Sequence, residues 1–222
     1  MSFQIAIDGP AGAGTSTIAR KVAREKGFIY VDTGAMYRAM AYYLLSCGVS
    51  RDNEQAIGEK CEGADITIQY ENGEQVVLLN GENVNGVIRT EEVGNMASSS
   101  SKHPKVRQRL TLLQKELART NNVVMDGRDI GTCVLPDADV KVYLTASVEV
   151  RAKRRFDELT AKNVPCDLKQ IAEDIAARDH QDMTREISPL KQAEDAVLVD
   201  SSDMTIEEVA ETIMKMTVTG GI

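Results

Sequence analysis

The chain has 222 residues, of which 42% are hydrophobic and 27% are charged. These proportions are ordinary for a globular protein and argue against wholesale disorder, and the length suits one domain or a core domain with small insertions. The net charge of −8 argues against a nucleic-acid polymer as a partner, because no global basic field would attract one.

The four cysteines and the apolar runs indicate the compartment. Cys47, Cys61, Cys133 and Cys166 are scattered, with no C-x-x-C pair and no histidine at ligand spacing. We expect reduced thiols that serve mainly in packing. No stretch has the pattern of a signal peptide or the length of a membrane span. We therefore expect a cytoplasmic monomer that does not act at membranes.

The first 27 residues have the pattern of a phosphate-binding loop. A strand is predicted at Phe3–Ile7, and a helix at Ile18–Lys26 that ends at Gly27. Between them the loop consists of Gly9, Pro10, Ala11, Gly12, Ala13, Gly14, Thr15, Ser16 and Thr17. Glycines let several backbone N–H groups point into one hollow, and the helix N-terminus adds a positive dipole end. The pattern predicts a loop that binds the phosphates of a nucleotide such as ATP.

Thr15 departs from the phosphate-loop pattern G-x-x-x-x-G-K-[ST], which has lysine after the last glycine. Threonine keeps a hydroxyl donor but carries no charge. Lys21 is a poor substitute, because it lies nearly two turns along the helix from the loop. Three explanations are open: an engineered change, a natural variant compensated by another cation, or a protein that binds nucleotide without turnover.

Apolar runs later in the chain predict four more buried strands. They are Phe28–Val31, Val123–Met125, Val140–Leu144 and Ala196–Val199. Each lies among helical patterns, which predicts an α/β fold with a five-stranded parallel sheet covered by helices on both faces. Thr205 and Glu208 form a capping box at the start of the last helix.

The segment 61–101 has a different pattern. Ile66–Tyr70 and Gln75–Leu79 read as an antiparallel hairpin joined at Asn72-Gly73, and Asn80-Gly81 makes a second turn. We interpret this meander as an inserted subdomain.

The insertion divides the predicted core into residues 1–60 and 102–222. At its end, the serine run Ser98–Ser101 precedes a helix predicted to start near Pro104. We favour a linker for this run over a source of hydroxyls for a ligand.

Polar residues follow two of the predicted strands. Asp32, Thr33 and Arg38 come after one strand, and parallel strands place such residues on the same rim as the phosphate loop. Asp32 or Thr33 is also expected to cap the next helix. Asp126 ends another strand, as does the second carboxylate of phosphate-loop enzymes, which orders Mg²⁺. Asp129 lies close by in the same charged Asp-Gly-Arg-Asp segment, for which a binding site is a better explanation than a turn.

Two predicted helices are rich in arginine. One carries Arg151, Lys153, Arg154 and Arg155, and the other carries Arg178, Asp179, Asp182 and Arg185. Such residues are often surface ion pairs worth about 0.2–0.5 kcal/mol each. In an acidic protein with a phosphate loop, we favour guanidinium groups that surround a transferring phosphoryl group.

Six segments together resemble the bacterial cytidylate kinases. They are Ile5–Gly14, Asp32–Arg38, Ile88–Val93, Pro104–Arg107, Asp126–Asp129 and Arg178–Asp182. The resemblance covers nearly the whole chain and implies a nucleoside monophosphate kinase that uses ATP and Mg²⁺ to phosphorylate CMP or dCMP. It also implies a core of the phosphate-loop NTPase type, a nucleoside-monophosphate-binding insertion and a short lid at about 155–167.

The resemblance implies a role for each matching residue. Arg38 and Arg128 would hold the CMP phosphate. Thr33, Arg107, Asp129 and Arg185 would contact the cytosine end or the nearby phosphate, with Tyr37 in the same site, and Ser98, Arg178 and Asp182 would contact the sugar. Ser16 or Thr17 with Asp126 would organise Mg²⁺, directly or through water. Asp126, Arg128, Arg151, Arg154 and Arg155 would form the catalytic set.

Two other functions are compatible with the sequence. One is a phosphate-loop kinase for another small acceptor, against which Asp129 and Arg107 argue. The other is a nucleotide-binding protein of the same fold without efficient turnover, which Thr15 suggests.

Overall fold

The computed structural model describes residues 2–219. The chain divides into two compact units, the first formed by residues 3–28 and those from Asn122 onward, the second by residues 29–121. Among the described residues, no helix is long and apolar enough to cross a membrane.

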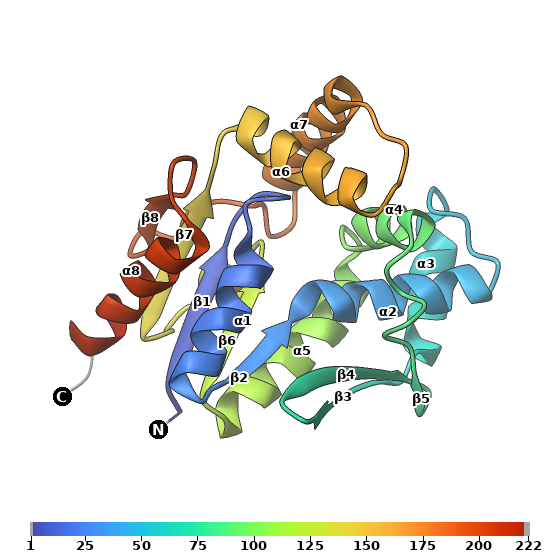
Figure 1. The fold of residues 1–222 in the computed structure, drawn as a ribbon. Helices are drawn as coiled ribbons and strands as arrows, with labels where there is room; N and C mark the ends of the chain where they lie inside the picture. Colours follow the sequence, from blue (N-terminus) through green and yellow to red (C-terminus); the bar gives the residue numbers. More distant parts are fainter. Residues whose placement is uncertain (1, 220–222) are drawn as a thin grey trace. The chain divides into compact units, whose positions relative to one another are not determined.

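A five-stranded parallel sheet has the strand order β2-β6-β1-β7-β8 (Figure 1). The strands are β1 (Gln4–Asp8), β2 (Ile29–Asp32), β6 (Val123–Gly127), β7 (Val140–Thr145) and β8 (Val197–Asp200). β1 pairs in parallel with β6 and with β7, and β7 pairs in parallel with β8. Ile5, Ala6 and Ile7 of β1 are fully buried, as expected of a central strand with both faces covered. The predicted fold class, including all five strands, is confirmed.

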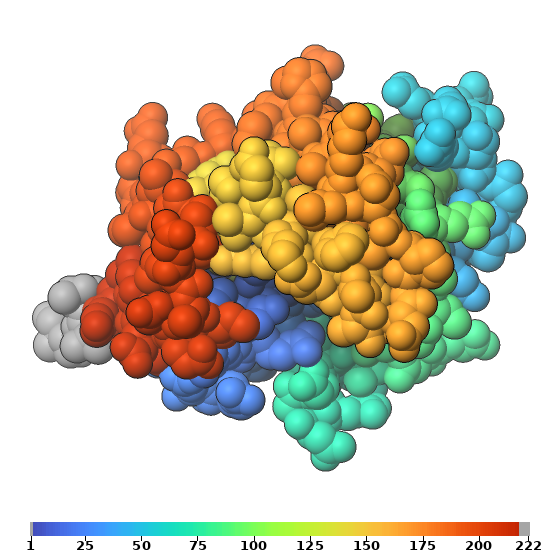
Figure 2. Space-filling view, turned by 45° about the horizontal axis from the view of Figure 1, so that its top comes forward, coloured from blue at the N-terminus to red at the C-terminus, as the bar shows by residue number. Residues whose placement is uncertain are grey.

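The first unit contains four α-helices and a short π-helix among its described residues. They are α1 (Thr15–Lys26), α6 (Val148–Ala161), α7 (Leu168–Thr184), α8 (Ile206–Thr219) and the π-helix η2 (Ile130–Val134). α1 buries Ile18, Ala19, Val22 and Ala23 and ends at Gly27, whose φ of 67° suits glycine. In the space-filling view, blue residues of the N-terminal segment are visible between the gold α6 region and the red C-terminal helix (Figure 2).

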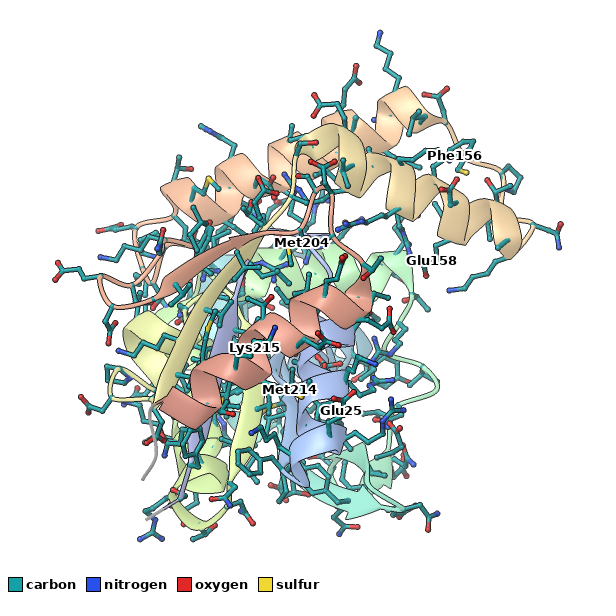
Figure 3. The ribbon with its side chains drawn as sticks, turned by 60° about the vertical axis from the view of Figure 1, so that its left-hand side comes forward. Glu25, Phe156, Glu158, Met204, Met214 and Lys215 are labelled. Carbon is teal, nitrogen blue, oxygen red and sulfur yellow. The ribbon has the colours of Figure 1, made fainter. Side chains whose placement is uncertain are left out.

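The capping box predicted for α8 is present. Thr205 Oγ1 accepts the backbone N–H of Glu208 at 3.2 Å, and the Glu208 carboxylate accepts the backbone N–H of Thr205 at 2.8 Å. From this start α8 runs alongside α1, and Met214 lies between the two helices (Figure 3). α8 therefore packs against α1 within the first unit.

The second unit combines helices with a small antiparallel sheet. Its helices are α2 (Thr33–Ser46), α3 (Glu54–Lys60), the 3₁₀ turn η1 (Cys61–Gly63), α4 (Glu91–Ser100) and α5 (Pro104–Thr120), and its strands are β3 (Ile66–Glu71), β4 (Glu74–Leu79) and β5 (Glu82–Asn83). The predicted meander is confirmed, with Asn72 and Gly73 at φ 52° and 81° in the first turn. The unit is longer than the predicted insertion at 61–101, whose role in binding the monophosphate stays a prediction.

The linker interpretation of Ser98–Ser101 was wrong. Ser98, Ser99 and Ser100 form the last turn of α4, and Ser101 is its C-cap. Thr90 caps the start of this helix, and Val93, Met96, Ala97 and Ser100 are buried along one face. This buried face stabilises the helix through residues that by composition alone resemble a linker.

The cysteines also differ from the expectation. Cys61 is buried and Cys133 and Cys166 are half-buried, but Cys47 is exposed, so a packing role does not suit Cys47.

Gly9 of the phosphate loop leaves no room for a side chain next to the sheet. A Cβ added at Gly9 would lie 2.1 Å from the backbone oxygen of Leu144 in β7. Because backbone atoms cannot give way as a flexible side chain can, we expect Gly9→Ala to lower the free energy of unfolding by about 1–3 kcal/mol in urea denaturation. Gly86→Ala is the control, since an added Cβ there meets no heavy atom within 4 Å. Equal effects of the two substitutions would contradict this account of Gly9.

Candidate active site

The phosphate loop has the backbone geometry of an anion-binding hollow. Gly12 and Gly14 have φ of 79° and 91°, a conformation that L side chains rarely adopt. Gly14 is the N-cap of α1, and the first helical hydrogen bond runs from the N–H of Ile18 to the Gly14 oxygen at 3.0 Å. The N–H groups of the first helical residues, Thr15 to Thr17, therefore have no acceptor within the helix. A phosphate group is a suitable acceptor for them.

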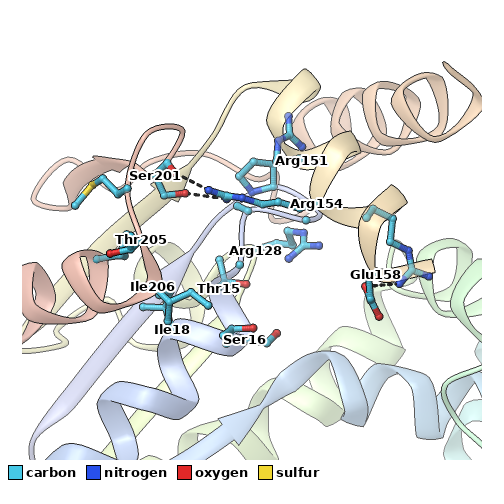
Figure 4. A pocket seen from close by; sticks show the side chains of 18 residues that line it. Thr15, Ser16, Ile18, Arg128, Arg151, Arg154, Glu158, Ser201, Thr205 and Ile206 are labelled. Carbon is cyan, nitrogen blue, oxygen red and sulfur yellow. Dashed lines mark hydrogen bonds and ion pairs between the residues drawn. The ribbon is translucent and has the colours of Figure 1, made fainter. Parts of the chain in front are cut away.

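A pocket of about 590 Å³ opens beside this loop within the first unit (Figure 4). One end is polar, formed by the loop and the side chains of Arg128, Arg151, Arg154 and Arg155. The other end is largely apolar, formed by Ile18, Met204, Ile206 and Val209. The volume lies in the range of small-molecule sites. A pocket with one cationic and one apolar end suits a ligand that joins phosphates to a flat ring system.

Asp126 connects the end of β6 to the phosphate loop. Its Oδ2 atom accepts hydrogen bonds from Ser16 Oγ at 2.7 Å and from Thr15 Oγ1 at 3.1 Å. The Asp126 carboxylate is buried, whereas Ser16 and Thr17 are exposed in the pocket wall. Thr15 thus points its hydroxyl at a carboxylate at the position where the pattern has lysine.

The oxygen atoms of this cluster fit Mg²⁺, a hard cation that prefers oxygen ligands. Among the described residues, no group of three or more His, Cys, Asp or Glu side chains is placed to hold a metal. A magnesium ion here would therefore take one carboxylate, a hydroxyl and oxygens from the nucleotide and water, as is common for this ion.

The Arg151 guanidinium makes hydrogen bonds and an ion pair within the first unit. Its Nε donates to the Ala146 oxygen and its Nη1 to the Ala11 oxygen of the phosphate loop, each at 2.9 Å. Nη1 also lies 2.7 Å from Asp179 Oδ2 of α7, and the two side chains are only 5% and 11% exposed. A single buried guanidinium therefore connects α6, α7 and the loop.

The other two arginines of α6 are more accessible. The guanidinium of Arg154 donates to the oxygen and hydroxyl of Ser201 at 2.6 and 3.2 Å, across the pocket (Figure 4). Arg155 pairs with Glu158 at 2.7 Å on the exposed side of the same helix. Surface pairs of this kind exchange partners at little cost, so Arg155 is able to turn to an anionic ligand.

Four of the residues predicted to bind the acceptor form one network in the first unit. Arg128 Nε lies 3.0 Å from Asp182 Oδ2, while Arg185 lies 3.8 Å from Asp129 and 3.9 Å from Asp182. Asp129, Asp182 and Arg185 have nearly buried side chains, whereas Arg128 is 23% exposed. Arg178, by contrast, is exposed on α7. The network holds two guanidinium groups and two carboxylates in fixed positions.

Asp8 supports the loop that carries Arg128 and Asp129. Asp8 Oδ1 accepts the N–H of Ile130 and Oδ2 accepts the N–H of Gly131, each at 2.7 Å. Burial raises the pKa of Asp8 to about 7, although both N–H groups favour the carboxylate. The central strand thus places the Asp8 carboxyl group where burial disfavours its ionised form.

The remaining predicted residues belong to the second unit. The Arg107 guanidinium lies 5.5 Å from the centre of the Tyr37 ring and donates to the Ser101 oxygen at 3.2 Å. Arg38, on the same helix as Tyr37, donates to the Ile88 oxygen at 3.5 Å. The structure therefore brings Tyr37 and Arg107 together.

Thr33 and Ser98 lie in the first turn of α2 and the last turn of α4. Thr33 is buried and Ser98 half-buried. Asp32 caps α2 as expected, accepting the N–H of Ala35 at 2.8 Å.

Sequence reasoning gave no role to Asp8, Asp179 or Ser201. The signal for Asp8 was present, because an acid that ends a buried strand directly before a glycine-rich loop needs partners for its carboxylate. No such signal exists for Asp179 and Ser201, since their partners are more than 25 residues away in the sequence.

Comparison with known proteins identifies the family. The sequence profile described as Cytidylate kinase matches residues 5–219. A cytidylate kinase of Shouchella clausii (strain KSM-K16) is 50% identical over 214 residues, covering 96% of this chain and 95% of that protein. The chain belongs to the cytidylate kinase family.

Other relatives agree with this assignment. A cytidylate kinase of Geobacillus sp. (strain WCH70) is 48% identical over 215 residues, covering 97% of this chain and 96% of that protein. Among solved structures, an uncharacterized protein from Eubacterium ventriosum ATCC 27560 shares the fold, with a TM-score of 0.56 and 12% identity over 99% of each chain. The resemblance to cytidylate kinases that the motifs indicate is thereby confirmed.

The buried pair of Arg151 and Asp179 predicts a large effect on stability. We expect Asp179→Ala to lower the free energy of unfolding by about 3 kcal/mol, because it leaves the Arg151 charge buried without its carboxylate. The double variant Arg151→Met with Asp179→Leu should recover part of this loss, because it removes both charges but leaves the Ala146 and Ala11 oxygens without their donor.

Chemical denaturation measures both effects. Glu158→Ala is the matched control, because it breaks the exposed pair with Arg155 and should cost at most about 1 kcal/mol. A loss for Asp179→Ala no larger than for Glu158→Ala would show that the buried pair contributes little.

Proposed function

We propose that this protein transfers the γ-phosphoryl group of ATP to CMP or dCMP, giving ADP and CDP or dCDP. Membership of the cytidylate kinase family supports this activity. The observation that carries it is the pocket of the first unit, where four arginines meet the phosphate loop, whose Ser16 is hydrogen-bonded to the buried Asp126. The proposal takes the enzyme as a cytoplasmic monomer.

The donor ATP would occupy this pocket with its phosphates at the polar end. Backbone N–H groups of the loop Gly9–Thr17, chiefly those of Thr15, Ser16 and Thr17, would hold the β- and γ-phosphates, and the nucleoside would lie toward Ile206 and Val209. The apolar end is suited to a purine ring, which gains from burial against aliphatic side chains.

Mg²⁺ would be held by Ser16 or Thr17 together with Asp126, directly or through water. The existing hydrogen bond from Ser16 to Asp126 supports this choice, because both oxygens already point to one place. When bound, the ion supplies charge neutralisation and orientation of the phosphate oxygens.

The family resemblance assigns the contacts of the acceptor CMP residue by residue. Arg38 and Arg128 would bind its phosphate. The Asp129 carboxylate is suited to accept a hydrogen bond from the N4 amine of cytosine. Uracil lacks this amine, so the contact would distinguish cytosine from uracil. The other assigned contacts are Thr33, Tyr37, Arg107 and Arg185 near the base or phosphate, and Ser98, Arg178 and Asp182 near the sugar.

The chemistry needs positioning and charge stabilisation more than covalent catalysis. A phosphate oxygen of CMP attacks the γ-phosphorus while the bond to the β-γ bridging oxygen breaks and ADP leaves. Arg128, Arg154 and Arg155 would stabilise the charge on the transferring group, and Arg151 would act at the same place and brace the loop. A lid at about 155–167 would close to exclude water, which competes with CMP.

A second candidate is a nucleotide-binding protein without efficient turnover. The observation that favours it is the hydrogen bond of Thr15 to Asp126, because a hydroxyl stands where the family pattern has a lysine ammonium. A kinase for a different small acceptor is a third candidate, separated from the first by its acceptor preference.

A panel of acceptors tests the first proposal. We expect ADP formation to be at least about tenfold faster with CMP or dCMP than with UMP or AMP, because unmatched polar groups in the acceptor site are costly. Coupled spectrophotometric assays at equal acceptor concentrations measure these rates. A faster reaction with UMP or AMP would refute the assignment of cytosine as the base.

Restoring the lysine tests the effect of position 15. We expect Thr15→Lys to raise kcat by about tenfold or more, since each tenfold requires only about 1.4 kcal/mol of transition-state stabilisation. Thr15→Met is the matched control, because it adds length without charge. Equal high rates for the unmodified chain and Thr15→Lys would mean that another cation replaces the lysine, whereas no activity in either would favour the binding protein.

A further inference from the structure

We propose that Asp8 is a positioning residue for the acceptor, which fixes the loop carrying Arg128 and Asp129 through its two carboxylate oxygens. The inference rests on the proposed function, since it assigns Asp8 to the binding of the same acceptor. It concerns residues of the first unit alone.

The contact of Asp8 with the loop uses the whole carboxylate. One oxygen accepts the N–H of Ile130 and the other accepts the N–H of Gly131, both at 2.7 Å. Asp8 is 5% exposed, so water does not replace these bonds easily. Without the carboxylate, two consecutive buried N–H groups would lose their acceptor, each at a cost of about 1–3 kcal/mol.

The loop held in this way is short and carries its functional side chains next to the anchor. Asp8 pairs in register with Gly127, and Ile130 directly follows Asp129. Both ends of the segment 127–131 are therefore attached to the end of β1. A shift of this anchor would move the backbone from which the Arg128 and Asp129 side chains extend.

The position of Asp8 is costly, which argues against a role as a packing residue. Burial raises its pKa to about 7, so the folded protein opposes the charge that the two N–H groups favour. An apolar residue would serve the central strand better, as Ile5 and Ile7 do. The carboxylate is useful where it holds the loop in one conformation.

Asp8→Asn tests the proposal, because the amide keeps the shape but presents an N–H group to one of the two donors. At pH 8, where Asp8 is mostly ionised, we expect the KM for CMP to rise by about tenfold or more while the KM for ATP stays within about twofold. Calorimetry of CMP binding without ATP should show the same weakening. Asp139→Asn is the matched control, since Asp139 accepts a single backbone N–H, that of Gln4 at 2.7 Å, at the other end of β1.

The outcomes separate the inference from the proposed function. If the unmodified protein binds no CMP, the proposed function fails. If it binds CMP but Asp8→Asn has an unchanged KM, weakens ATP and CMP equally, or behaves as Asp139→Asn does, the positioning role is refuted. If Asp8→Asn does not fold, Asp8→Ser replaces it in the same assays, and failure of both variants to fold would show that Asp8 serves the fold and overturn the proposal.

Discussion

The carboxyl end of β1 is the point on which the rest of the site depends. Two consecutive residues make the contacts there. Asp8 accepts the N–H groups of Ile130 and Gly131, and the Gly9 N–H donates to the Gly127 oxygen at 3.3 Å. Gly9 also approaches β7 so closely that only a hydrogen fits in place of a side chain. Because β1 lies in the middle of the sheet, these contacts tie the phosphate loop and the Asp-Gly-Arg-Asp segment to a buried central strand. This attachment fixes the backbone positions of both loops.

Positive charge in this acidic protein is local and largely paired. Arg151 is held by Asp179, and Arg128 and Arg185 are held by Asp182 and Asp129. Buried ion pairs often add little to stability compared with apolar residues of the same size. Their value here is orientation, since paired guanidinium groups lose little further freedom when an anionic ligand arrives. The net charge of −8 therefore coexists with a cationic pocket.

Local sequence patterns were sufficient for most of the fold. All five strands of the parallel sheet, the hairpin turn at Asn72-Gly73 and the capping box at Thr205 follow from periodicity and turn chemistry, which are properties of neighbouring residues. Ser98–Ser101 was misread because its helix depends on burial of Met96 and Ala97, a tertiary effect.

The sequence suggested the residues that we propose for the site, but not the contacts between them. The motifs named Arg128, Arg151 and Asp182, but not which side chains would pair with one another. The pairing of Arg151 with Asp179 and the Ala11 oxygen, or of Arg154 with Ser201, joins elements far apart in the chain. Sequence spacing carries no information on such contacts, which only the folded chain defines.

The triple attachment of Arg151 has a mechanical consequence. The Arg151 guanidinium links the Ala11 carbonyl of the phosphate loop to the α6–α7 hairpin. Strain in the loop or in the hairpin is therefore transmitted to the other. Because thermodynamic linkage is reciprocal, any free energy that the arrangement of this hairpin adds to nucleotide binding is added by the bound nucleotide to the stability of that arrangement. Nucleotide binding at the phosphate loop and the conformational stability of the α6–α7 hairpin are therefore thermodynamically coupled through Arg151.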